Sequence, residues 1–342
     1  MKVEGQAFSC KMIKKKVLLL IGLVLAGEVL AGCAAGLPGT PTLEADQQPI
    51  FTDTKPEITE IAALPTSTPA MLASPPVTKI PPPPKESPGR VPAVEEVPIE
   101  PQAVEFQAQD GQSLTGRYFP PATRPAPLVV LMHWAPGDQN DWIVIADWLQ
   151  NRMVPPIALR SQPWQDSSWF PPVPKERSVG VFTFTFRGCD GGCKSFTRDE
   201  WLLDAQAAMQ TARQLNGIDP ARIVAIGASI GADGAADGCA WLNNQYPDSC
   251  LGALSLSPGG YLTVPYAEAV KALGAEPTPK PAWCLLAQGD SESKHACQDI
   301  EGQNYQAFQY PGKDHGMMLI QSGAEPNPLE IILDFLEQTI WE

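Results

Sequence analysis

The 342-residue sequence contains only three histidines, and no two of its cysteines stand in a C-x-x-C spacing. Zinc sites built from such units are therefore disfavoured, and neither a metal nor an organic cofactor is expected. Basic residues are also scarce: 24 stand against 38 acidic ones, which gives a formal net charge of −14. This excess of negative charge argues against nucleic acid as a partner.

The N-terminal part has an apolar run, Val17 to Leu25, but the run is too short for a comfortable membrane span. Three lysines (14–16) precede it, and Leu-Ala-Gly-Cys (30–33) follows. This pattern resembles a bacterial lipoprotein signal, residues 1–32, with cleavage before an acylated Cys33. The resemblance implies an extracytoplasmic protein that is attached to the lipid bilayer of the cell membrane through Cys33. An ordinary secretory signal or an N-terminal membrane anchor is the alternative.

Residues 33–101 show no apolar period and are rich in proline and threonine, with four consecutive prolines at 81–84. Such a segment cannot bury a core and is expected to form an extended, semi-rigid linker after the lipidated cysteine. Residues 102–342 remain, enough for one substantial α/β domain.

Within this domain, apolar strand-like runs alternate with helix-like segments. Strands are expected at 103–109 and 113–119, which form a hairpin around Asp110-Gly111, and at 128–132, 179–186, 222–226, 251–256, 282–287 and 305–310; helices are expected at 142–152, with Asp141 as its cap, and at 198–215, 232–241 and 328–341. The alternation predicts an α/β fold with a mostly parallel, doubly wound sheet behind an antiparallel hairpin. Ligands of such sheets bind beyond the carboxyl ends of the strands.

The pattern Gly227-Ala228-Ser229-Ile230-Gly231 lies between one of these strands and a small-residue helix. Strand, sharp turn and helix are the context that a nucleophile elbow requires. Glycines two residues either side of Ser229 suit a strained turn in which larger side chains would clash. A small-residue helix start without chemistry is the alternative.

A serine nucleophile needs a base, and chain order selects among the three histidines. In elbow-type hydrolases the acid and the base follow the serine, which favours His315, after the last strand. His295 lies in a polar helical stretch and reads as a surface residue, and His133 precedes Ser229.

The acid is expected on the loop after the strand at 282–287, where Asp290 and Glu292 both qualify. Asp290 is favoured because it is the shorter group at the strand end. An oxyanion hole needs two N–H donors. The N–H of Ile230 supplies one, and the N–H of Trp134 or Ala135 the other.

Five segments together resemble the α/β-hydrolase superfamily, nearest to its dienelactone-hydrolase-like and prolyl-oligopeptidase-like branch. They are Leu131-Met132-His133-Trp134, Phe186-Arg187-Gly188, the serine pattern at 227–231, Gly289-Asp290 and Gly312-Lys313-Asp314-His315-Gly316. The resemblance implies the α/β-hydrolase fold, a triad of Ser229, Asp290 and His315, and hydrolysis of a small-molecule ester or acyl substrate. Dienelactone hydrolases proper use cysteine, so Ser229 favours general carboxylesterase chemistry. A peptidase or acyltransferase with the same triad, or a non-catalytic surface binding protein, is the alternative.

The sequence departs from that family at two places. Trp134 follows His133 where the family often has glycine, so a differently shaped oxyanion loop is expected. Cysteines flank the turn after Phe186. Beyond Cys10 and Cys33, an exported domain with six cysteines favours disulfides between sequence neighbours, with buried free thiols as the alternative. The expected pairs are Cys189–Cys193, Cys239–Cys250 and Cys284–Cys297.

Two longer connections bear on the pocket. Residues 155–177, rich in proline and tryptophan, join a helix to a strand and are expected to cover the amino ends of the strands; their length also lets them wrap toward the serine. Residues 258–280 occupy the place where this superfamily inserts a cap, and they are too short for a large one. Without a large cap, the substrate pocket is expected to be open and only modestly selective among substrates.

Overall fold

The computed structural model describes residues 100–151, 162–177, 179–275 and 277–341. The predicted signal sequence, Cys33 and nearly all of the proline-rich linker lie outside these residues. The described residues belong to one compact unit of the chain. Among their helices, none is both long and apolar enough to cross a membrane.

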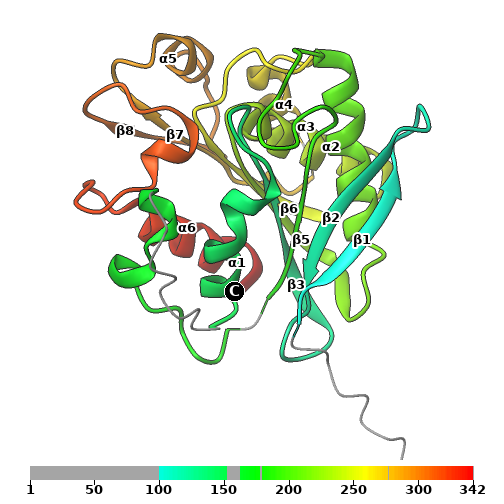
Figure 1. The fold of residues 1–342 in the computed structure, drawn as a ribbon. Helices are drawn as coiled ribbons and strands as arrows, with labels where there is room; N and C mark the ends of the chain where they lie inside the picture. The colour runs from blue at the N-terminus through cyan, green and yellow to red at the C-terminus, as the bar shows by residue number, and fades with distance from the viewer. Residues whose placement is uncertain (1–99, 152–161, 178, 276, 342) are drawn as a thin grey trace, which may run out of the picture. The chain divides into compact units, whose positions relative to one another are not determined.

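One sheet organises the described residues (Figure 1), with eight strands in the order β1-β2-β4-β3-β5-β6-β7-β8. Its strands are β1 Gln102–Gln107, β2 Ser113–Phe119, β3 Ala126–Met132, β4 Gly180–Phe184, β5 Ile218–Ala228, β6 Cys250–Leu256, β7 Ala282–Ala287 and β8 Tyr305–Tyr310. β2 pairs antiparallel with β1 and β4, and every pair from β4 to β8 is parallel. The predicted hairpin and mostly parallel sheet are confirmed.

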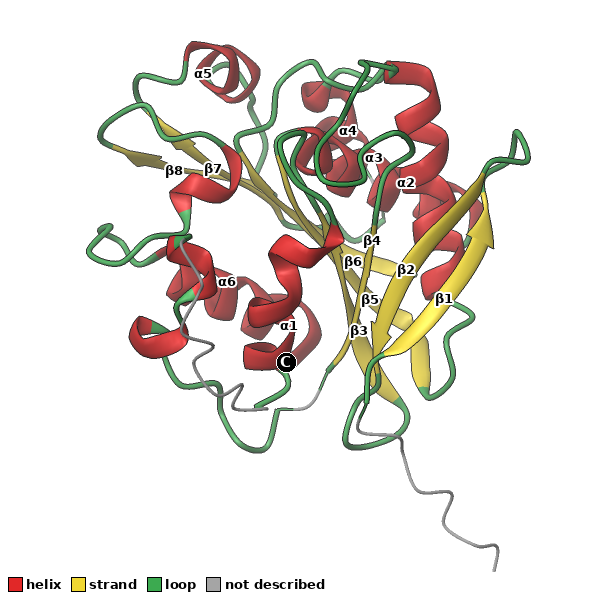
Figure 2. Cartoon of the chain, in the orientation of Figure 1, coloured by secondary structure: helices red, strands yellow, loops and turns green. Residues whose placement is uncertain are grey.

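Helices pack on both faces of this sheet (Figure 2). They are α1 Ile143–Leu149, α2 Arg198–Ala212, α3 Ile230–Gln245, α4 Tyr266–Gly274, α5 Ser291–Cys297 and α6 Pro328–Leu336. Side chains of β3 alternate between two cores because successive strand residues point to opposite faces. Val130 packs in the core beneath α2, α3 and α4, and Val129 in the core beneath α1 and α6. This two-sided burial explains why the central strands read as continuous apolar runs.

Some element ends differ from the expectation. The helix expected at 142–152 begins with a 3-10 turn, Gln139–Trp142, and α1 follows it. Asp138, not Asp141, caps this turn by accepting from the N–H of Asn140 at 2.8 Å. The closing helix ends at Leu336 and continues as a π-helical turn, Glu337–Trp341.

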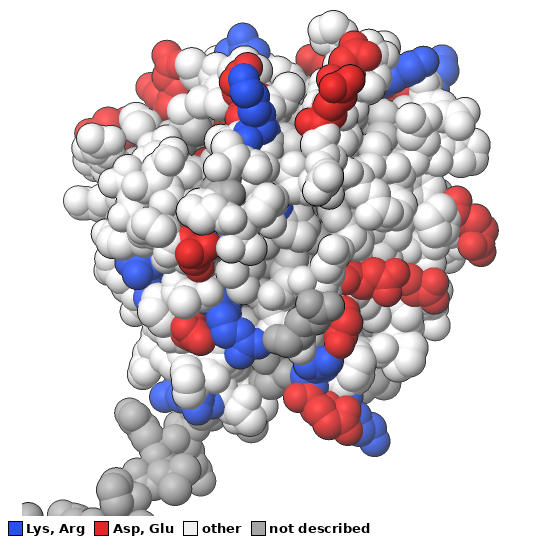
Figure 3. Space-filling view, turned by 180° about the vertical axis from the view of Figure 1, so that it is seen from behind, with Lys and Arg blue, Asp and Glu red and all other residues white. Residues whose placement is uncertain are grey.

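A buried ion pair secures the turn after β4. The Arg187 guanidinium contacts the fully buried Asp204 of α2 at 2.6 Å and Asp110 of the β1–β2 turn at 2.5 Å. The Asp204 carboxylate also accepts from the Arg187 N–H at 2.9 Å. One arginine therefore ties the hairpin, the sheet and α2 together. On the face seen in Figure 3, acidic and basic side chains are interspersed, without a continuous basic patch.

Candidate active site

Ser229 occupies a strained turn between β5 and α3. Its backbone has φ 54° and ψ −117°, a region that non-glycine residues rarely adopt. The flanking glycines are required by space: a Cβ on Gly227 would lie 1.8 Å from the carbonyl oxygen of Gly231, and one on Gly231 would lie 2.3 Å from the carbonyl oxygen of Met132. The turn thus lifts Ser229 to the carboxyl end of the sheet and admits the loop after β3 beside it.

Ser229, His315 and Asp290 form one hydrogen-bonded chain. His315 Nε2 lies 2.9 Å from Ser229 Oγ, and Nδ1 lies 2.7 Å from Asp290 Oδ2. With a proton on Nδ1 that is donated to Asp290, Nε2 is free to accept the serine proton. The structure therefore brings together the three residues that the resemblance implied as a triad.

Asp290 is held ready as a carboxylate. Burial raises the pKa of this carboxyl, but hydrogen bonds from Ser293 and His315 and the nearby imidazole outweigh that effect and leave the pKa below its ordinary value. Ser293 Oγ donates to Asp290 Oδ2 at 2.7 Å. Asp290 also caps α5, and the N–H of Gly289 before it donates to the carbonyl of Gly312, near His315, at 2.8 Å. The loops that carry Asp290 and His315 are thereby joined.

Glu292, the other acid candidate, interacts with Tyr261 instead. Burial is the main cause that raises the pKa of the Tyr261 phenol. The negative charge of Glu292 and its hydrogen bond with the phenol raise this pKa further. The Tyr261 ring stands edge-on to His315, with 6.0 Å between centroids. Its loop is held by the buried Asp233 of α3, which accepts from the N–H groups of Gly259 at 2.9 Å and Tyr261 at 2.7 Å.

The two remaining histidines take other places. His295 is exposed on α5. His133 is fully buried, and burial lowers its pKa to about 4. Its Nδ1 lies 2.7 Å from the Trp134 carbonyl, and the N–H of Phe186 donates to Nε2 at 3.0 Å. A neutral His133 thus connects the loop after β3 to the turn after β4, a role that the sequence did not predict.

The disulfide Cys189–Cys193 lies against the same loop after β3. The N–H of Cys193 donates to the Ala135 carbonyl at 2.7 Å. Two further disulfides occur at the expected pairs, Cys239–Cys250 between α3 and β6, and Cys284–Cys297 between β7 and α5.

The indole of Trp134 lies beside Ser229. A Cβ on Gly316 would lie 3.0 Å from Trp134 Cε3 and 3.6 Å from Ser229 Cβ, so the indole and the serine flank the same point. Trp134 Nε1 donates to Asp141 at 2.8 Å, and the ring packs edge-on against the buried Trp164, with centroids 5.4 Å apart. Asp141, expected as a helix cap, holds this indole instead.

The described part of the 155–177 connection departs from the favoured expectation. Trp164 lies in the 3-10 turn Pro163–Gln165, which contacts the turn Gly316–Leu319 directly after His315. This part of the connection therefore reaches the carboxyl side of the sheet and supports the site.

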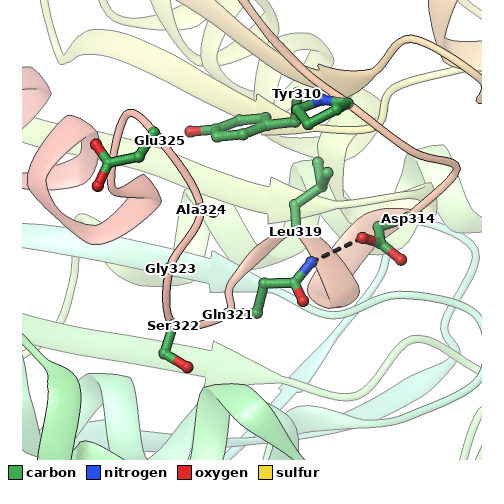
Figure 4. Close-up of a pocket in the computed structure, with 9 residues that line it drawn as sticks. Tyr310, Asp314, Leu319, Gln321, Ser322, Gly323, Ala324 and Glu325 are labelled. Carbon is green, nitrogen blue, oxygen red and sulfur yellow. Dashed lines mark hydrogen bonds between the residues drawn. The ribbon is translucent and has the colours of Figure 1, made fainter.

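The His315 loop is also secured on its outer side. Asp314 accepts from Gln321 Nε2 at 2.7 Å, beside a pocket under Tyr310 (Figure 4). No group of three or more potential metal ligands occurs among the described residues.

The sequence matches the family model of acetyl xylan esterase (AXE1) over residues 94–249, under half of its 342 residues. The uncharacterized protein YfhR of Escherichia coli K12 is 32% identical over 133 residues, which are 38% of each chain. YfhR of Salmonella typhi is 27% identical over 158 residues, 44% of this chain and 46% of the relative. The matched regions thus span less than half of these relatives.

Two solved structures resemble the chain at low identity. The esterase Pf2001 of Pyrococcus furiosus is 14% identical, with a TM-score of 0.48 over 71% of this chain and 93% of its own. The α/β hydrolase GrgF of Penicillium sp. sh18 is 15% identical, with a TM-score of 0.48 over 71% of this chain and 100% of its own. The strand order and the turn at Ser229 are those of an α/β-hydrolase fold. The chain therefore has this fold, and over residues 94–249 its sequence is similar to an esterase family.

Proposed function

We propose that this protein is a serine carboxylic-ester hydrolase that acts through Ser229, His315 and Asp290. The observation that carries the proposal is the hydrogen-bond chain from Ser229 Oγ at 2.9 Å through both ring nitrogens of His315 to Asp290 at 2.7 Å. Its position at a strained turn, at the carboxyl ends of the parallel strands, supports a catalytic rather than a structural role.

The reaction follows from these contacts. His315 Nε2 takes the Ser229 proton as Oγ attacks the ester carbonyl, and Asp290 stabilises the imidazolium that forms. The same proton then passes from Nε2 to the departing alcohol, which leaves an acyl-serine. Water attacks this ester with His315 again as base, so carboxylate is released and Ser229 regains its proton.

Two backbone N–H groups are proposed to hold the oxyanion. Ile230 is the first residue of α3, so its N–H has no partner within the helix and carries the positive end of the helix dipole. The second donor is assigned to Ala135. The His133 carbonyl faces Gly231, where a Cβ would lie 2.6 Å away, so the N–H of Trp134 in the same planar peptide points away from α3.

The proposed substrates are esters of short acyl groups, with acetyl groups on hydroxylated carbohydrates as the class. The fixed Trp134 indole beside Ser229 leaves little room for a long acyl chain. The family description, acetyl xylan esterase, supports the same class.

The test is turnover by the full chain of p-nitrophenyl acetate, butyrate and octanoate, acetylated xylan and peptide p-nitroanilides, each beside Ser229→Ala. Acetate release that disappears in the variant is expected. Faster cleavage of anilides than of esters would make the protein a peptidase. Transfer of acetyl to an added alcohol, instead of release, would make it an acyltransferase. If the folded protein turns over none of these substrates, the alternative of a non-catalytic binding protein is the one that remains.

The location is also a proposal: anchoring to the bacterial cell membrane on its extracytoplasmic side through acylated Cys33. The lysines, short apolar run and small residues before Cys33 support it. Cys33→Ser should abolish acylation, so detergent partitioning and the mass of the mature protein should change. If both stay as in wild type, the lipoprotein assignment is wrong.

A further inference from the structure

A second cavity lies away from Ser229, among α2, α3 and the residues at the end of β1. Its volume is about 420 Å³. Its lining consists of Gln107, Gln109, Leu203, Gln206, Ala207, Gln210, Trp241 and Gln245. Five of these eight side chains are amides and none is charged, although 18% of the chain is charged. We call it the glutamine groove.

Most of these amides are free to bind a ligand. Within the described residues, the side chains of Gln107, Gln109, Gln206 and Gln245 form no hydrogen bond with the protein, and Gln210 donates to the Tyr246 hydroxyl at 3.3 Å. An amide offers two donors and an acceptor without net charge. The four amides without a protein partner therefore line the groove with uncharged hydrogen-bond donors and acceptors.

The helices give the groove a regular form. Gln206 and Gln210 lie one turn apart on α2, and Trp241 and Gln245 one turn apart on α3. α2 and α3 pack against each other, so the two rows face a common hollow. Trp241 is half-buried and rests on the core, which gives the groove a rigid, flat apolar surface.

We propose that the glutamine groove binds a segment of a neutral oligosaccharide. Sugar hydroxyls both donate and accept, which matches amides, and the C–H face of a pyranose ring stacks on an indole. Phosphorylated or uronic-acid ligands would require cations, and the lining has none.

This groove is distinct from the catalytic site. Trp241 lies twelve residues after Ser229, so the helical rise separates them by roughly 18 Å. A polymer held at both places would gain apparent affinity through effective concentration, with no new contact at Ser229. The inference goes beyond the proposed function, and its test requires no turnover.

The test is titration of full-length Ser229→Ala protein with cellohexaose and xylohexaose, followed by calorimetry and ligand-observed NMR. Hexagalacturonate serves as the charged comparison. Binding of a neutral hexasaccharide with a Kd on the order of a millimolar or tighter is expected, with no binding of the charged one.

Variants locate the binding. Gln206→Ala combined with Gln245→Ala should lower affinity by about tenfold or more, since each neutral hydrogen bond contributes roughly two- to tenfold. Trp241→Ala should abolish binding and Trp241→Phe should retain part of it. Gln214→Ala is the matched control, exposed just beyond α2 and outside the groove, and should bind as the parent does. Circular dichroism checks that each variant is folded.

Three outcomes would overturn the inference. The first is failure of both neutral hexasaccharides to bind. The second is binding that the groove variants leave unchanged, which would move it elsewhere on the protein. The third concerns a synthetic peptide with the proline-rich sequence of residues 75–90. If this peptide binds, the groove variants weaken its binding and the sugars do not bind, then the groove holds a polyproline ligand.

Discussion

Replacing Asp290 by asparagine should prevent His315 from acting as the base, although His315 itself stays in place. At present Nδ1 of His315 donates to Asp290 Oδ2 at 2.7 Å, which leaves Nε2 able to accept from Ser229. If the new amide turns its nitrogen to the ring, the proton moves to Nε2 and Ser229 loses its acceptor. If it turns its oxygen, the hydrogen bond stays but the charge that stabilises imidazolium is gone.

The expected loss in kcat for p-nitrophenyl acetate is about 10³–10⁴-fold, equivalent to roughly 4–5.5 kcal/mol of barrier. Because the Asp290 pKa lies below its ordinary value, its charge persists throughout pH 5–9, so the loss should be present across that range.

Glu292→Gln is the matched control. Glu292 is exposed and engages Tyr261, so kcat should stay within about threefold of wild type. A mild effect of Asp290→Asn beside a severe effect of Glu292→Gln would refute the assignment of the acid and transfer it to Glu292.

Three further outcomes are expected. Trp134→Ala should raise kcat/KM for p-nitrophenyl octanoate relative to the acetate by about tenfold or more; an unchanged ratio would remove the indole as the limit on acyl length. Cys284→Ala with Cys297→Ala should lower the free energy of unfolding in urea by about 2–4 kcal/mol; no change would mean that the disulfide adds nothing. Burial holds the His133 pKa at about 4, against about 6.5 in the unfolded chain, so its contribution to stability is lost as pH falls from 6.5 to 4. His133→Asn should therefore lose less stability between pH 7 and 4.5 than wild type, by on the order of 2–3 kcal/mol, and equal losses would contradict this.

The strand pattern and the order of the loops were predictable from the sequence because both depend on local signals. A buried parallel strand needs a continuous apolar run, as at residues 128–132, and the turn at Ser229 needs glycine at 227 and 231. From these the parallel sheet and the grouping of Ser229, Asp290 and His315 at its carboxyl edge both follow.

The supporting contacts were not predictable, since they join residues distant in sequence. The local sequence predicts that Asp141 caps a helix, but its carboxylate accepts a hydrogen bond from the indole of Trp134 instead. In the sequence, His133 is only a histidine that precedes Ser229 and so is not chosen as the base. Its structural role depends on the hydrogen bond that the N–H of Phe186, distant in sequence, donates to its ring. Trp164 comes from a helix-to-strand connection, which topology alone assigns to the opposite edge. Only tertiary packing determines these partners.

The central claim is that Ser229 is the nucleophile, and a covalent label tests it most directly. Full-length protein treated with a fluorophosphonate should gain one adduct, mapped by peptide mass spectrometry to Ser229, and should lose ester turnover in parallel. Folded Ser229→Ala protein should gain no adduct and hydrolyse p-nitrophenyl acetate several orders of magnitude more slowly. An adduct on another residue, or near-normal turnover by that variant, would contradict the account.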